Sequence, residues 1–178
     1  MTPIRRTLLI AAVGGVAAAA GYATHLYRLG GLGGGAPADI GRAILDGRLT
    51  TLDGTPQTLS GFSGRILVVN YWATWCEPCR EEIPMFVRLQ QEYVVKNVQF
   101  VGIAVDQVDK VREFAKEFNI NYPLLMGGMD AIELSRQAGN KAGVLPYTLI
   151  LNPAGKIAAS LVGGISEERM RGALQPLL

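Results

Sequence analysis

Two cysteines separated by two residues are the side chains in this sequence best suited to catalysis. Cys76-Glu77-Pro78-Cys79 lies between an almost continuous apolar run, residues 65–72, and a segment whose apolar residues recur at helical spacing. At the start of a helix, free backbone amides and the helix dipole stabilise an anion, so Cys76 is the candidate thiolate. Cys79 lies one turn further on, close enough to close a disulfide. The pattern predicts thiol–disulfide exchange, in which Cys76 attacks a target disulfide and Cys79 resolves the mixed disulfide.

The composition excludes several other classes of protein. Two cysteines and one histidine in 178 residues are too few for a four-ligand zinc site or a disulfide-dense scaffold. The histidine, His25, precedes the predicted domain, so a Cys–His hydrolase has no base there. A formal charge of +2 is too close to neutral for a nucleic-acid binder driven by phosphate contacts. A structural disulfide and a copper(I) site of two thiolates stay open as alternatives, and no resident cofactor or metal is expected.

The elements that must position the cysteines follow from hydrophobic periodicity. The expected strands cover residues 65–72, 98–105, 122–126, 147–151 and 156–162, and the expected helices cover 77–94, 108–118, 130–138 and a last segment capped by Ser166. Residues 47–60, with Asp53-Gly54 as a turn, predict an extra hairpin before this core. The expected fold is therefore α/β, a mixed central sheet with helices on both faces.

The first 35 residues have a composition of their own. Arg5 and Arg6 precede an uncharged stretch over residues 7–27, and residues 30–35 contain five glycines. A helix of about 21 residues spans roughly 31 Å, enough to cross the hydrocarbon core of a bilayer. The predicted organisation is a signal peptide or N-terminal membrane anchor, a Gly-rich linker and a folded domain, over residues 1–28, 29–38 and 39–178. Either leader places the domain outside the cytoplasm, and the paired arginines fit ordinary or twin-arginine export.

Two sequence blocks resemble the TlpA/ResA-type disulfide reductases of the thioredoxin superfamily. The first is WATWCEPCR over residues 72–80, followed by Glu82 and Pro84, and the second is GVLPYT over residues 143–148. The resemblance covers roughly residues 46–178. It implies a thioredoxin-like fold with the extra N-terminal hairpin and a central αβ insertion.

The same resemblance gives further residues a role. It implies a cis peptide bond before Pro146, which leaves the backbone of Leu145 free to pair with a substrate strand. It implies that Glu82 is a partly buried acid near the disulfide that relays protons and raises thiol pKa values. Trp75 is expected to form a wall of the contact surface. Glu77 and Pro78, between the cysteines, complete the supporting residues.

One departure from thioredoxins proper bears on this assignment. Asn70 occupies the place where thioredoxins keep a buried aspartate, which fits the TlpA/ResA type and leaves Glu82 as the remaining acid.

The resemblance also implies partners and a compartment. It indicates a periplasmic or other extracytoplasmic reductase, tethered to the inner membrane through residues 7–27 if the leader is uncleaved, and a membrane thiol-electron donor of the DsbD/CcdA kind. The client is a disulfide-bearing protein, of the kind met in cytochrome c or copper-site maturation, and a monomer is expected.

A thiol peroxidase is the second enzymatic alternative, because the insertion is similar to that of peroxiredoxins. Their peroxidatic loop has threonine three residues before cysteine, whereas Thr74 stands two before Cys76.

Overall fold

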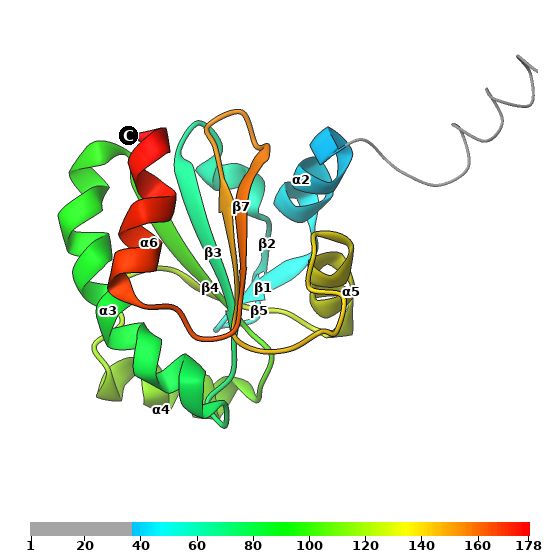
Figure 1. Ribbon diagram of the computed structural model, residues 1–178. Coiled ribbons are helices and arrows are strands. Elements are labelled where there is room, and N and C mark those ends of the chain that lie inside the picture. Colours follow the sequence, from blue (N-terminus) through cyan, green and yellow to red (C-terminus); the bar gives the residue numbers. More distant parts are fainter. Residues whose placement is uncertain (1–36) are drawn as a thin grey trace, which may run out of the picture. The chain divides into compact units, whose positions relative to one another are not determined.

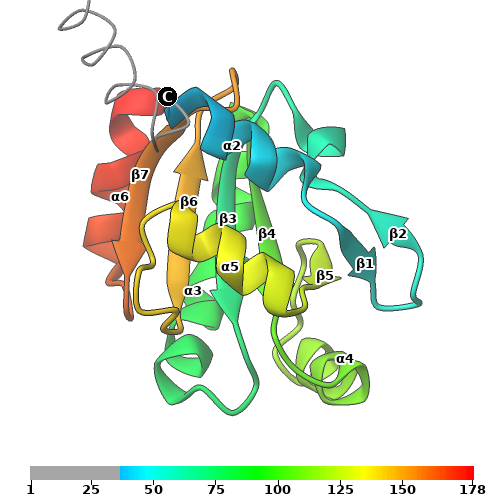
Figure 2. The ribbon, with the colours of Figure 1, turned by 90° about the vertical axis from the view of Figure 1, so that its right-hand side faces the viewer.

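The computed structural model describes residues 37–178, and these form one mixed sheet with helices on both faces (Figures 1 and 2). Seven strands lie in the order β2-β1-β5-β4-β3-β6-β7. The strands are β1 (Leu49–Thr51), β2 (Pro56–Gln57), β3 (Ile66–Trp72), β4 (Val98–Ala104), β5 (Leu124–Met126), β6 (Tyr147–Leu151) and β7 (Ile157–Val162). The helices are α2 (Pro37–Asp46), α3 (Glu77–Tyr93), α4 (Val108–Glu117), α5 (Met129–Gln137) and α6 (Glu167–Leu174).

The strand directions bring the chemistry to one end of the sheet. β3, β4 and β5 are parallel, whereas β6 pairs antiparallel with β3 and β7 antiparallel with β6. The carboxyl ends of β3 and β4 and the start of β6 therefore meet at the same edge, because antiparallel neighbours run in opposite directions. From β1 onward this is the strand and helix order predicted from the sequence, including the extra hairpin β1–β2. The elements α4 and β5 between β4 and α5 agree with the central αβ insertion that the resemblance implies.

Strand β3 is the centre of the core and is buried along its whole length. Alternate residues point to opposite faces of the sheet, so Leu67, Val69 and Tyr71 join the cluster that packs under α2 and α5. Val68 joins the cluster under α3 and α6, which lie together on the other face (Figure 1). Asn70, two residues further, faces α3, which places a polar group inside that face.

Helix α2 is the element that the sequence predictions lack. It begins at Pro37, before the predicted domain start at residue 39, and packs against the turn between β6 and β7. A side chain at Gly41 would place its Cβ 2.1 Å from the carbonyl oxygen of Gly155, so this helix needs a glycine to approach the turn. Glycine in a helix costs about 1 kcal/mol relative to alanine, so the sequence gives only a weak signal for a short helix that contains glycine and follows a Gly-rich linker.

The predicted leader over residues 1–28 and most of the linker over 29–38 lie outside the described residues. Among residues 37–178, no helix combines the length and apolar character needed to cross a bilayer.

Candidate active site: a disulfide at the start of a helix

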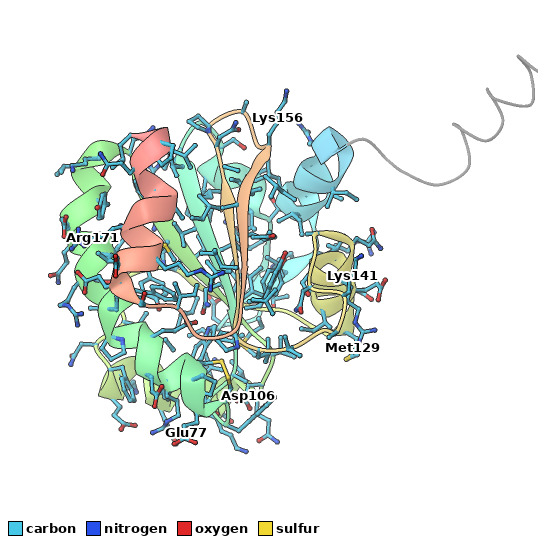
Figure 3. All side chains as sticks on the ribbon, in the orientation of Figure 1. Glu77, Asp106, Met129, Lys141, Lys156 and Arg171 are labelled. Atoms are coloured by element: carbon cyan, nitrogen blue, oxygen red, sulfur yellow. A yellow bond between two sulfur atoms is a disulfide. The ribbon has the colours of Figure 1, made fainter. Side chains whose placement is uncertain are left out.

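Cys76 and Cys79 form a disulfide at the start of α3, at the carboxyl end of β3 (Figure 3). The Sγ–Sγ bond is 2.05 Å long, and the Cα atoms lie 5.3 Å apart. Cys76 precedes the first helical residue and keeps 6% of its surface exposed, whereas Cys79 is fully buried. Both cysteines pack in one cluster with Trp72 and Ile83. The exposure difference is what the predicted division of roles requires, with Cys76 attacking and Cys79 resolving.

The loop that carries Trp75 into the site is held by Asp106, which follows β4. One carboxylate oxygen of Asp106 accepts the backbone N–H of Thr74 at 2.9 Å and its hydroxyl at 2.5 Å. Arg80 donates to the carbonyl of Thr74 at 3.3 Å. Burial opposes ionisation of Asp106, but the hydrogen bonds from Thr74 and from a further backbone amide outweigh it and hold the pKa of this carboxyl below its ordinary value. Trp75 is 68% exposed beside this anchored residue.

An Asp106→Ala variant should lose about 2 kcal/mol of the free energy of unfolding, because the Thr74 N–H and hydroxyl lose a charged acceptor. Urea denaturation of the full chain measures the loss. Asp109→Ala is the matched control, since Asp109 is 84% exposed and ion-pairs with Arg112 one turn along α4. The control should lose under about 1 kcal/mol. Equal losses in the two variants would contradict the anchoring role of Asp106.

Glu82 lies on α3, one turn after Cys79, and is 4% exposed. Its Oε1 accepts from the side-chain amide of Asn70 at 2.8 Å, and its Oε2 accepts from the backbone N–H of Ile165 at 3.2 Å. The same Asn70 Nδ2 donates to the hydroxyl of Thr148 at 3.0 Å. Strand β3 and the loop before α6 thus both donate to one buried carboxyl group, and strand β6 is linked to it through Asn70. The predicted burial of Glu82 is confirmed, and it is deeper than the sequence alone indicates.

Burial raises the pKa of Glu82 from 4.5 to about 7, although the hydrogen bonds from Asn70 and Ile165 favour the ionised form. A groove of about 480 Å³ between α3 and the loop before α6 reaches this carboxyl group, and Pro78 and Arg88 are among its lining residues. A carboxyl group that titrates near neutral pH is suited to accept and donate protons there. The arrangement therefore offers a buried proton acceptor that lines a groove and shares a helix with the second cysteine.

The loop before β6 supplies the third part of the site. The Leu145–Pro146 peptide bond is cis, as the resemblance implies. The carbonyl of Pro146 accepts from the N–H of Gly163 at 2.9 Å, and Leu145 packs against the cluster that contains both cysteines. Within residues 37–178, the N–H and C=O of Leu145 have no hydrogen-bond partner. They are available to a bound chain, which is the use that the resemblance implies.

Comparisons with known proteins agree with this geometry. The AhpC/TSA family matches residues 40–160. The chain belongs to the AhpC/TSA family. Thioredoxin-like protein YneN of Bacillus subtilis is 31% identical over 138 residues, covering 75% of this chain and 78% of the relative. Thiol-disulfide oxidoreductase ResA of Bacillus anthracis is 26% identical over 141 residues, covering 78% of each chain.

A solved structure extends the likeness to the fold. The crystal structure of a secreted thiol-disulfide isomerase from Corynebacterium glutamicum superposes with a TM-score of 0.67 and 26% identity, covering 74% of this chain and 83% of the other. With the Cys76–Cys79 disulfide at the start of α3, these likenesses identify this AhpC/TSA member as a thiol–disulfide oxidoreductase of thioredoxin-like fold.

Two residues of the site receive no role in the sequence predictions. Thr148 is a polar residue inside the apolar strand β6, and a buried hydroxyl needs a partner. Asp106 is an acid directly after the buried run ending at residue 105, and parallel neighbours such as β3 and β4 end at the same edge. Both signals are present in the sequence, but pairing Thr148 with Asn70 requires knowing that β6 lies beside β3.

Proposed function

We propose that the oxidoreductase is an extracytoplasmic reductase of selected protein disulfides. The observation that carries this proposal is the placement of the disulfide at the start of α3, with Cys76 6% exposed and Cys79 fully buried. In the reduced protein, the Cys76 thiolate attacks one sulfur of a client disulfide and releases the other as a thiolate. Cys79 then attacks Cys76, re-forms the disulfide and releases the second client thiol. Two electrons pass to the client, and a membrane thiol-electron donor of the DsbD/CcdA kind restores them.

Glu82 supplies the proton chemistry of this cycle. Exchange needs one thiol deprotonated and a leaving thiolate protonated at different steps. Because burial holds the pKa of Glu82 at about 7, its carboxyl group can take the Cys79 proton and return it near neutral pH. The groove beside α3 gives the carboxyl a route to solvent.

The charge between the cysteines favours reduction over oxidation of clients. Glu77 is exposed in the first turn of α3 and bears no opposite charge within hydrogen-bond reach among the described residues. Its negative charge disfavours the Cys76 thiolate and opposes the helix dipole. A less stabilised thiolate makes the reduced pair a stronger reductant, because strongly oxidising pairs are those whose reduced form is stabilised.

The support for export comes from the sequence rather than from the described domain. Arg5 and Arg6 ahead of the apolar stretch over residues 7–27 support a cleaved signal peptide or a tether to the inner membrane. Cytochrome c or copper-site maturation is the client context that the TlpA/ResA resemblance supports.

The reduction potential of the wild-type pair tests the direction of electron flow. Equilibration of the full chain with glutathione should give a value near that of thioredoxin, about −270 mV. A value near about −120 mV, that of a strong oxidant, would overturn the reductase assignment. Insulin reduction by the same preparation supplies the activity readout.

Peroxide turnover separates the peroxidase alternative from the proposal. The hydroxyl of Thr74 donates to Asp106, and the guanidinium of Arg80 lies 5.2 Å from the ring centroid of Phe114, so both candidate activating groups are engaged by other partners. The proposal expects peroxide reduction no faster than by a free thiol.

A further inference from the structure

Asn140 lies in the loop between α5 and β6 and is 1% exposed. Its Nδ2 donates to the carbonyl of Val144 at 2.9 Å, and its Oδ1 accepts the N–H of Val144 at 3.0 Å. Two residues that face each other in an antiparallel sheet exchange the same pair of hydrogen bonds. The side-chain amide of Asn140 therefore makes the two hydrogen bonds to Val144 that a neighbouring strand would otherwise make.

The loop around Asn140 is fixed by contacts of its own. Nδ2 of Asn140 also donates to the hydroxyl of Ser135 at 3.2 Å, and its backbone N–H donates to the carbonyl of Ser135 at 2.9 Å. The N–H of Gly143 closes the turn on the carbonyl of Asn140 at 2.8 Å. Gly143 has φ +64°, and a Cβ there would stand 2.8 Å from Nε of Arg136, so the turn requires glycine. These contacts fix Asn140 independently of its hydrogen bonds to Val144.

The pairing of Val144 leaves the backbone of the next residue as the free one. Both backbone groups of Val144 are bonded to the side chain of Asn140, whereas the N–H and C=O of Leu145 have no partner within residues 37–178. Val144 cannot pair with an incoming strand, whereas Leu145 can.

We propose that Asn140 is a positioning residue for client binding, which fixes Val144 so that an extended client segment pairs with Leu145 in one register. The occupant is the backbone next to the client's disulfide cysteine. The proposal rests on the proposed function, because it concerns how that function presents a client disulfide to Cys76. It predicts that Asn140 matters for peptide disulfides and much less for disulfides that lack a backbone.

Single-turnover kinetics of the pre-reduced full chain test this prediction. Two probes are compared, a symmetric disulfide of a short cysteine peptide and hydroxyethyl disulfide. Asn140→Ala should raise the half-saturating concentration of the peptide about tenfold, the effect of losing the paired geometry of two backbone hydrogen bonds. The maximal rate with the peptide and the rate with hydroxyethyl disulfide should each fall by no more than about twofold, since neither depends on register.

Asn152→Ala is the matched control for loss of a turn-holding asparagine. Its Oδ1 accepts the N–H groups of Ala154 and Lys156, both at 3.0 Å, in the turn at the other end of β6. This variant should leave the ratio of peptide to hydroxyethyl disulfide activity unchanged. If Asn140→Ala slows both probes by the same factor, or leaves the half-saturating concentration of the peptide unchanged, the positioning role is wrong.

A change in the substrate keeps the proposal testable when Asn140→Ala does not fold. Methylation of the backbone nitrogen next to the peptide cysteine removes the N–H that would donate to the carbonyl of Leu145. With the wild-type protein, this methylation should raise the half-saturating concentration about tenfold. No change would overturn the register proposal while leaving the reductase intact. A wild-type protein that reduces hydroxyethyl disulfide but no peptide overturns both proposals.

Discussion

A Cys79→Ser variant should accumulate as a mixed disulfide with insulin, joined through Cys76, whereas Cys76→Ser should form none. Once reduced, the Cys76 thiolate of the first variant breaks the client S–S bond and forms a new one. The serine hydroxyl at position 79 cannot attack that bond, so the adduct persists. The exposures of the two sulfur-bearing residues, 6% for Cys76 and none for Cys79, give the reason for this order of attack.

Non-reducing electrophoresis measures the adduct as a band that dithiothreitol removes. Insulin reduction by either variant should fall to the rate without enzyme, because one cycle needs both sulfurs. The double variant, with serine at both positions, controls for disulfides formed elsewhere, and the two cysteines are the only ones in the chain. Equal trapping by Cys76→Ser and Cys79→Ser would show that the helix start does not select Cys76. Unchanged insulin reduction by Cys76→Ser would sink the oxidoreductase mechanism itself.

Local patterning is sufficient for the elements that carry the cysteines. The apolar run over residues 65–72 predicts a strand buried on both faces, and β3 is buried throughout. The sequence predicts Ser166 as a cap, and its hydroxyl accepts the N–H of Arg169 at 3.3 Å. Both features depend on residues close together in the chain. A capping hydroxyl bonds an amide a few residues away, and an apolar run is a property of consecutive residues. Helix α2 escapes prediction because its packing, through Gly41 against Gly155, depends on a distant turn.

The polar contacts of the site depend on pairs far apart in the sequence. Asn70 and Thr148 are separated by 78 residues, and Thr74 and Asp106 by 32. Neither the amino-acid composition nor the hydrophobic periodicity indicates which of the many polar residues will form hydrogen bonds with one another. The resemblance predicts a role for Glu82, but it does not predict the hydrogen bond from the side-chain amide of Asn70. Buried polar groups need hydrogen-bond partners, so a buried Asn70 implies that partners exist. Identifying Thr148 requires the strand order of the sheet, and identifying Glu82 requires the packing of α3 on β3.

Glu82→Gln should remove the dependence of stability on pH that this one group contributes. In the native protein the pKa of Glu82 is about 7, and 4.5 is the ordinary value expected for the unfolded chain. Between these values the native state binds a proton that the unfolded state has lost, so wild-type stability falls as pH rises. The contribution is fully present below about pH 4.5 and is lost above about pH 7, and it amounts to about 3 kcal/mol. The glutamine variant lacks this slope.

Urea denaturation from pH 4 to pH 8 measures the difference between wild type and Glu82→Gln, and Glu81→Gln controls for removal of one charge on the same helical turn. Other ionisable groups face the same region, namely Tyr122, whose own pKa is raised by burial and by Glu82, and Glu81, Arg88 and Glu167 along the groove. These groups are common to wild type and Glu82→Gln, so their titration contributes to both curves. A difference between the two curves that stays constant with pH would mean that Glu82 does not hold a proton near neutrality. The relay role would then fail with it, because a carboxyl group that stays ionised at pH 7 cannot return a proton to Cys79.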